Sequence, residues 1–166
     1  MLYSIKWSIA FFTMTINPLN LSIIILLALV LIYDIKYFKI PNILVLLIFI
    51  ISGINVLLSE NELIYLIGLF IGFGLFYFLY LLFPKGIGFG DVKLAGAIGL
   101  FLGFKLTILT ILLSFFSGAI VGLFLIAIGK KTMKDPIPFG PFLAFGAIFS
   151  MFFGEYIIDW YMKLLV

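Results

Sequence analysis

The stretch Gly88-Phe89-Gly90-Asp91-Val92-Lys93-Leu94 places a carboxylate directly after two glycines, at the start of an apolar segment. A charged side chain is costly next to hydrocarbon, so an ionisable residue in such a place indicates a functional site with a partner. The candidate partner is Asp34, which lies near the end of an earlier apolar run. The two positions predict a pair of carboxylates at one depth of a membrane.

The composition is typical of a protein with several membrane-spanning helices. Of the 166 residues, 66% are hydrophobic and 10% are charged. A soluble domain has about 45–50% apolar and about 25% charged residues. Helices cross a bilayer because they satisfy their backbone hydrogen bonds internally. We therefore expect an all-α membrane protein, a bundle of about six transmembrane helices in the lipid bilayer.

The residue types that are missing narrow the chemistry. The sequence has no cysteine and no histidine. Disulfides, thiol catalysis, a Ser-His triad and the usual zinc ligand sets are therefore excluded. Seven acidic residues remain for acid–base chemistry, and the net charge of +3 is better explained by membrane topology than by nucleic acid. We expect no metal, no cofactor and no nucleic-acid partner.

Breaks in the apolar pattern divide the chain into spans. Proline, glycine and charged clusters mark the loops. The six predicted spans run over residues 21–37, 43–58, 63–83, 91–104, 106–128 and about 136–153. Residues 1–17 are short for a span, so we expect an interfacial helix or tail there, with a seventh crossing as the alternative. Residues 18–166 are expected to form a single six-span domain.

Lysine counting predicts the orientation. Seven lysines lie in or beside the loops after the first, third and fifth spans: Lys36, Lys39, Lys85, Lys93, Lys130, Lys131 and Lys134. Three lie on the other side: Lys6, Lys105 and Lys163. Lysine is enriched in cytoplasmic loops, so the seven-lysine side is expected in the cytoplasm. Asp34 and Asp91 belong to that side. We therefore expect a multi-pass protein of the cytoplasmic membrane whose site faces the cytoplasm.

Three pairs of glycines have the spacing Gly-x-x-x-Gly: Gly68 and Gly72, Gly99 and Gly103, and Gly118 and Gly122. Small residues at this spacing let helix backbones approach closely. The segment after Asp91 is also rich in small residues, so it can be surrounded by other helices. The alternative is that these glycines reflect only the general abundance of glycine in membrane helices.

Two neighbouring carboxylates suit the hydrolysis of an amide. The attacking water needs a base to take its proton, and the leaving nitrogen needs an acid. Two carboxylates in contact share one proton, because like charges a few Å apart cannot both ionise. One is then the base while the other is the acid. Gly88 and Gly90 have no Cβ, which would let an extended substrate backbone come close to Asp91.

Each carboxylate also has a structural explanation. Asp91 follows Gly-x-Gly and opens a helix, where it would serve as an N-cap. Asp34 would be an interfacial residue paired with Lys36 or Lys39. For the pair as a whole, a small proton-coupled membrane carrier is the rival function. A structural subunit of an assembly, with both carboxylates as helix caps, is the third.

Three motifs in one order carry a resemblance to a known family. They are Asp34-Ile35-Lys36 followed by Ile40-Pro41-Asn42, then the stretch from Gly88 to Leu94, then Pro138-Phe139-Gly140-Pro141-Phe142-Leu143-Ala144. Together they resemble the type IV prepilin peptidase family, the GxGD-type intramembrane aspartyl proteases. The likeness runs from about Leu21 to the last span. Presenilin-like proteases share Gly-x-Gly-Asp and a Tyr-Asp pair, but they are longer and their surrounding residues fit less well.

The resemblance implies an aspartic endopeptidase in which Asp34 and Asp91 are the catalytic pair. It also makes five residues candidates for substrate binding: Pro41, Asn42, Gly88, Gly90 and Lys93. The implied substrate is a prepilin, or a pilin-like or preflagellin precursor. Its short basic leader would be removed after a glycine at the cytoplasmic border, before the hydrophobic pilin helix.

The larger bacterial members of that family carry an additional cytoplasmic region with a four-cysteine zinc motif, linked to N-methylation. This sequence has no cysteine. It therefore resembles the minimal, peptidase-only members of archaeal preflagellin or Tad-type pilus systems, and N-methylation is not expected of it. The sequence leaves the oligomeric state open.

Overall fold

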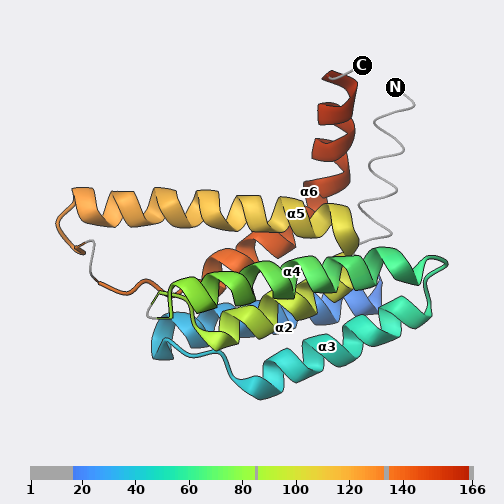
Figure 1. Cartoon of the computed structure of the whole chain (residues 1–166), viewed down its shortest axis with the longest axis horizontal. Helices are drawn as coiled ribbons and strands as arrows, with labels where there is room; N and C mark the ends of the chain where they lie inside the picture. The colour runs from blue at the N-terminus through green and yellow to red at the C-terminus, as the bar shows by residue number, and fades with distance from the viewer. Residues whose placement is uncertain (1–16, 85, 133–134, 165–166) are drawn as a thin grey trace.

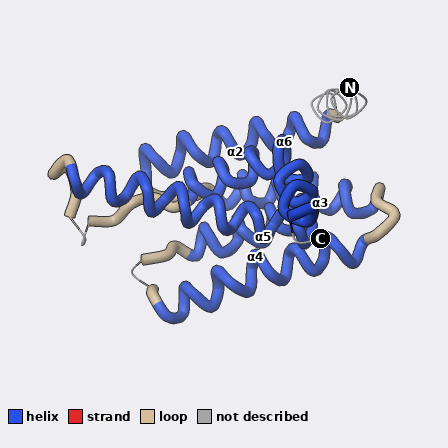
Figure 2. The backbone as a smooth tube through the Cα atoms, turned by 90° about the horizontal axis from the view of Figure 1, so that it is seen from above, coloured by secondary structure: helices blue, strands red, loops and turns tan. Residues whose placement is uncertain are grey.

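The structure is a computed structural model that describes residues 17–84, 86–132 and 135–164. This part of the chain forms five helices (Figure 1): α2 Pro18–Tyr37, α3 Asn42–Leu57, α4 Glu62–Leu82, α5 Phe89–Ala127 and α6 Gly140–Leu164. Over these residues the backbone is helix and loop, without strands (Figure 2). The expected all-α architecture is confirmed. The interfacial helix expected over residues 1–17 lies almost wholly outside the described residues and stays a prediction.

The long helix α5 is divided into two helical segments. A straight helix of its 39 residues would be about 58 Å long, twice the thickness of the hydrocarbon core of about 30 Å. Gly103 has φ 73° and ψ 177°, and the chain reverses its direction there (Figure 1). Residues 89–102, the first segment of α5, and residues 104–127, the second segment, match the predicted spans 91–104 and 106–128.

The predicted number of spans agrees with the structure. Four helices (α2, α4, α5 and α6) are long and apolar enough to cross a membrane, and α3 is a shorter apolar helix of 16 residues. Because α5 counts twice, the described part of the chain supplies about six spans. A slightly short helix such as α3 is accommodated by local thinning of the bilayer.

Helix ends follow local sequence signals in most places. Asn17 caps α2 by accepting a hydrogen bond from the backbone N–H of Leu19 at 3.0 Å, and Pro18 occupies the first turn. The last span is the exception. It was predicted from about residue 136 to residue 153, but α6 begins at Gly140 and continues to Leu164. Pro136 and Pro138 keep the chain extended, because a residue that precedes a proline is disfavoured in a helix.

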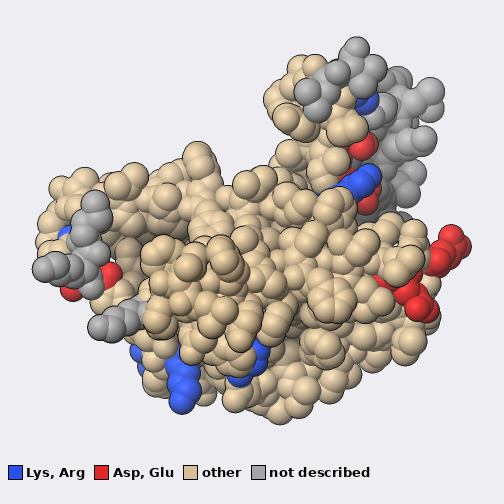
Figure 3. All heavy atoms as spheres, viewed as in Figure 1, with Lys and Arg blue, Asp and Glu red and all other residues tan. Residues whose placement is uncertain are grey.

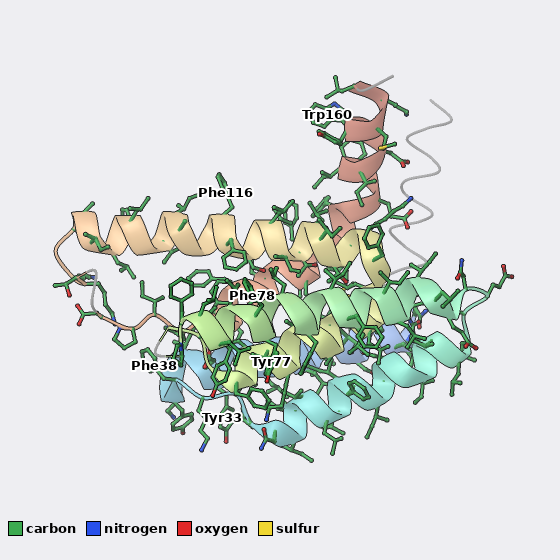
Figure 4. The ribbon with its side chains drawn as sticks, viewed as in Figure 1. Tyr33, Phe38, Tyr77, Phe78, Phe116 and Trp160 are labelled. Atoms are coloured by element: carbon green, nitrogen blue, oxygen red, sulfur yellow. The ribbon has the colours of Figure 1, made fainter. Side chains whose placement is uncertain are left out.

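The last part of α6 turns away from the other helices (Figure 1). Its aromatic side chains are exposed: Tyr156 by 50%, Trp160 by 57% and Tyr161 by 57%. Figure 4 shows Trp160 near the free end of this helix. Tyrosine and tryptophan in such a place are typical of the membrane–water interface.

The first segment of α5 lies at the centre of the bundle. Its residues from Asp91 to Phe101 are buried, except for the half-buried Lys93. Helices α3, α4 and α6 pack against α5, and the core around it includes fully buried side chains from every helix: Leu27, Val30, Ile48, Phe76, Leu94 and Leu143. This confirms the prediction that the segment after Asp91 is surrounded by other helices.

Helices α4 and α5 approach each other backbone to backbone. A Cβ atom added to Gly68 would collide with the carbonyl of Gly99, and one added to Gly72 would collide with the carbonyl of Ala95. Two of the predicted glycine pairs therefore meet at one interface. At the third pair, an added Cβ atom would meet only side chains, at ordinary van der Waals distance: Phe139 and Phe142 beside Gly118, and Ile137 beside Gly122.

Hydrogen bonds attach α3 to α5. The Ser52 hydroxyl donates to the carbonyl of Ala97 at 3.0 Å, and the Asn55 side-chain amide donates to the carbonyl of Phe101 at 3.3 Å. Helices α3 and α4 are consecutive, yet they touch each other little. Figure 1 shows them close at their connecting turn and farther apart toward their other ends.

We predict that Gly68→Ala destabilises the protein by about 1–3 kcal/mol, because the new methyl group would force α4 away from α5. Gly74→Ala is the matched control on the same helix. A Cβ atom at Gly74 meets no atom within 4 Å, so its effect should stay within about 0.5 kcal/mol. Thermal unfolding in detergent measures both, and equal melting temperatures for the two variants would contradict the proposed packing.

Candidate active site

Asp34 lies in the last turn of α2 and faces inward. Its side chain is only 5% exposed, and its Oδ2 accepts a hydrogen bond from the backbone N–H of Gly140 at 3.0 Å. Gly140 is the first residue of α6, so the carboxylate lies at the positive end of that helix. This offsets the unfavourable position of an acidic residue at the end of α2. The alternative in which Asp34 reaches out to Lys36 or Lys39 does not fit a buried carboxylate.

Asp91 lies in the first turn of α5. Its Oδ2 accepts a hydrogen bond from the backbone N–H of Gly88 at 3.1 Å, and Gly88 is the N-cap residue. The alternative in which Asp91 itself is the N-cap is therefore wrong, because Asp91 is the third residue of the helix. The other oxygen, Oδ1, is buried and has no hydrogen-bond partner among the described residues. A buried polar atom without a partner requires an explanation, and support of the helix start uses only Oδ2.

The two carboxylates line one cavity of about 370 Å³. The rest of the wall comes from the loop between α2 and α3, which contributes Phe38, Lys39 and Ile40, and from the first residues of α3 and α5. Figure 4 shows Phe38 at this end of the molecule, with Tyr33 at the same end. The Tyr33 ring contacts the Tyr37 ring, with 5.0 Å between centroids, and it does not line the cavity.

Four of the five residues predicted to bind substrate line this cavity: Asn42, Gly88, Gly90 and Lys93. The Lys93 ammonium donates a hydrogen bond to the side-chain oxygen of Asn42 and lies 5.3 Å from the centre of the Phe89 ring. The fifth residue, Pro41, is not part of the wall. It is the N-cap of α3 and places its neighbour Asn42 at the cavity.

The glycines next to Asp91 pack tightly within the protein. A Cβ atom at Gly88 would lie 3.2 Å from Oδ2 of Asp91, and one at Gly90 would lie 3.2 Å from Cβ of Ile40. Small residues at both positions therefore let the loop fold closely around the carboxylate. This gives the glycines a packing role in addition to the predicted approach of a substrate.

Gly140 is a site residue to which the sequence analysis assigned no role. A Cβ atom there would lie 2.6 Å from Oδ2 of Asp34, so any side chain would displace the carboxylate. The available signal was the motif Pro138-Phe139-Gly140-Pro141, in which a glycine stands between prolines at a helix start. The pairing of this glycine with Asp34, which is 106 residues away, has no local signal in the sequence.

The chemistry of the cavity is that of two carboxylates, two lysines, the Asn42 amide and backbone N–H groups. Among the described residues, no three His, Cys, Asp or Glu side chains gather at a position that could hold a metal ion. A carboxylate pair of this kind can take a proton from water and deliver a proton to a leaving group.

Comparison with known proteins identifies a family. The model of the type IV leader peptidase family matches residues 21–123, a range that includes both carboxylates. This match covers more than half of the chain. No solved structure matches the chain.

Curated relatives are similar over part of their length. A prepilin leader peptidase/N-methyltransferase of Legionella pneumophila is 42% identical over 76 residues, which are 46% of this chain and 26% of the relative. A protein of the same name from Bacillus subtilis is 35% identical over 79 residues, 48% of this chain and 32% of the relative. The chain thus spans about a quarter to a third of the length of these relatives.

Proposed function

The chain belongs to the type IV leader peptidase family, and from this premise we propose that it is an intramembrane aspartic endopeptidase. Its substrates would be prepilins, or pilin-like or preflagellin precursors, from which it removes the leader. The observation that carries the proposal is that Asp34 and Asp91, from two different helices, are both buried and line one cavity. The names of the relatives, prepilin leader peptidases, agree with this substrate class.

In the proposed mechanism the pair holds one proton when a substrate is bound. The ionised carboxylate takes a proton from a water molecule, whose oxygen attacks the scissile carbonyl carbon. The protonated carboxyl group donates to the carbonyl oxygen, and a proton then passes to the leaving nitrogen. The peptide bond breaks, and the products are a carboxylic acid and an amine. Oδ1 of Asp91, which has no partner among the described residues, supplies a free oxygen for this water.

The surrounding residues suit the binding of an extended peptide. A helical substrate hides its peptide bonds in its own hydrogen bonds, so the scissile segment must be unwound. In the proposal, the backbone of the loop at Gly88 and Gly90 lies beside this segment, while Asn42 and Lys93 offer polar contacts at the cavity wall. We propose the peptidase reaction alone for these residues.

The charge distribution supports a cytoplasmic location of the cavity. Side chains of both signs occur near the free end of α6, and an acidic side chain lies beside the loop between α5 and α6 (Figure 3). Lysines gather at the end of the molecule where α2 ends and α5 begins, whereas the end with the turn between α3 and α4 carries acidic side chains. Among the latter, Glu60 and Glu62 belong to the turn and helix start between α3 and α4. Because lysine-rich loops stay in the cytoplasm, the proposal places the cavity at the cytoplasmic face of the membrane.

The catalytic prediction concerns the two carboxylates. Asp34→Asn and Asp91→Asn should each lower cleavage of a prepilin by about 1,000-fold or more while the protein remains inserted, because asparagine cannot accept or deliver the shared proton. The double variant should be no worse than either single variant, because the two groups act as one unit. Cleavage in membranes, measured by the gel shift of the precursor, tests this.

Three acidic residues outside the cavity serve as controls: Glu60→Gln, Glu62→Gln and Asp135→Asn should keep activity. Asp135, for example, accepts hydrogen bonds from the backbone N–H and hydroxyl of Thr132 and does not line the cavity. Full cleavage by Asp91→Asn would overturn the dyad. It would instead fit a role in the helix start, where asparagine would be tolerated.

A second prediction concerns the support of Asp34. Gly140→Ala should displace the carboxylate, because the new methyl group would lie within 2.6 Å of Oδ2. A misplaced catalytic group of this kind should lower kcat by about 10- to 100-fold. Gly129→Ala would be a poor control because Gly129 has a positive φ. Gly53→Ala, which meets no atom within 4 Å, should keep wild-type kcat. Wild-type kcat in Gly140→Ala would show that this contact does not position the carboxylate.

The third prediction concerns orientation. The sequence has no cysteine of its own, so each introduced cysteine is a unique label. Cysteines near Lys39, Pro84 and Lys131 should be protected from an impermeant thiol reagent added to intact cells, and a cysteine near Asn61 should react. Labelling near Lys131 with protection near Asn61 would reverse the proposed orientation.

A further inference from the structure

A second hollow lies beside the carboxylate cavity. It has a volume of about 540 Å³ and is lined mainly by apolar side chains of α3 and α4, including Leu46, Phe49, Leu69 and Phe73. Its floor is the first segment of α5 at Gly96 and Ala97. We call this hollow the α3–α4 groove. Its residues belong to helices that span the membrane, so the groove opens toward lipid.

The groove exists because α3 is attached to α5 and not to α4. Ser52 and Asn55 hold the later part of α3 to α5, and the Lys93–Asn42 hydrogen bond joins the start of α3 to α5. Between these attachments, α3 and α4 stand apart. The floor is low because it consists of small residues. A Cβ atom at Gly96 would lie 3.1 Å from Cβ of Phe73.

The groove and the carboxylate cavity share two residues. Asn42 and Lys93 line both hollows, so their hydrogen bond forms the boundary between them. A chain that places a peptide bond at Asp34 and Asp91 can continue past this boundary along α3. The carboxylates have polar surroundings, whereas the groove has an apolar wall within the membrane. The part of the chain that enters the groove would therefore have to be apolar.

We propose that the α3–α4 groove holds the apolar segment that adjoins the scissile bond of the substrate. This inference rests on the proposed peptidase function and adds the surface that recognises the membrane-embedded part of the substrate. The groove is too small to enclose a whole helix, whose diameter with side chains is about 10–12 Å. It suits a row of large side chains from one face of an apolar helix, the mode in which a groove receives a helix through spaced anchors.

Lipid is the competing occupant of any apolar hollow that opens to the bilayer. The continuity with the carboxylate cavity favours the substrate, because a cleaved chain must leave the cavity on both sides of its scissile bond. On the side bounded by Asn42 and Lys93, the groove is the adjoining surface. Van der Waals contact with the groove wall would align the substrate helix and hold the scissile bond at the carboxylates.

The test compares two substrates and two variants of the full chain in proteoliposomes. One substrate is a prepilin with its complete apolar helix, and the other is the same precursor truncated shortly after its scissile bond. Leu46→Trp fills the groove from a side chain that is 53% exposed. Ile67→Trp is the matched control, since Ile67 is 46% exposed on α4 and does not line the groove.

The quantity that decides is the ratio of kcat/KM for the long substrate to kcat/KM for the short one. Leu46→Trp should lower this ratio by about tenfold, because the indole would fill the space of roughly one large side chain of the substrate and remove its contacts with the groove. Ile67→Trp should keep the wild-type ratio. An unchanged ratio in Leu46→Trp would overturn the inference alone and leave lipid as the occupant. If the wild type cleaves neither substrate, the proposed function fails and the inference fails with it.

Photo-crosslinking gives a readout that does not depend on the stability of Leu46→Trp. A photoreactive benzoylphenylalanine at position 46 should crosslink to the apolar helix of the long substrate in the otherwise inactive Asp91→Asn background. The same group at position 67 should crosslink to lipid. Crosslinks to lipid alone at both positions would contradict the proposed occupant.

Discussion

The close approach of α4 to α5 is the contact on which the rest of the bundle depends. At Gly68 and Gly72 the backbone of one helix lies against the backbone of the other, near Ala95 and Gly99. Within a bilayer, hydrophobic exclusion adds little between helices, so association depends on van der Waals packing and hydrogen bonds. Because no large side chains separate the two backbones at this interface, α4 can pack closely on the first segment of α5, which lies at the centre of the bundle. The site and the groove are then built on that segment.

The candidate site is assembled at helix ends. Asp34 belongs to the last turn of α2, Asp91 to the first turn of α5, and Gly140 to the first turn of α6. Helix starts present free N–H groups, and each carboxylate accepts a hydrogen bond from one of them. This arrangement makes two buried acidic groups tolerable at the edge of an apolar bundle. It also leaves Oδ1 of Asp91 without a hydrogen-bond partner among the described residues, which is the oxygen that the proposed mechanism uses.

Much of the fold could be predicted from the sequence, because spans and loops are local features. Pro18, Pro41 and the charged turn at Glu60 mark helix borders in both sequence and structure. The reversal inside α5 was also predicted, from the break between residues 104 and 106, and the structure places it at Gly103, whose backbone is not helical. The start of the last span was predicted at about residue 136, whereas α6 begins at Gly140, after Pro136 and Pro138.

The sequence predicted that Asp34 and Asp91 lie close together at one membrane depth, and the structure places both at one cavity. A carboxylate beside apolar sequence is a local signal, so Asp34 and Asp91 could be paired by their common depth. Other features of the candidate site could not be predicted. The contact between Asp34 and Gly140 joins residues at opposite ends of the described chain, and no local pattern encodes it. The α3–α4 groove is a property of three helices and of the hydrogen bonds at Ser52 and Asn55. Such a hollow forms where two neighbouring helices do not pack against each other. The local pattern of a single sequence does not predict which helices remain apart.

The depth of the carboxylates bears on the choice between a peptidase and a carrier. A carrier binds its ion or substrate near the middle of the bilayer, so that either face can be opened to it. Here both carboxylates lie at helix ends, and side chains at mid-helix such as Leu27 and Ile98 are apolar and buried. A hydrolase does not need a site near the middle of the bilayer. It needs water and a peptide bond at the same place. In the proposed function, the border between the lysine-rich loops and the apolar bundle would supply both, because water would enter from the loops while an apolar segment of the substrate stays in the membrane.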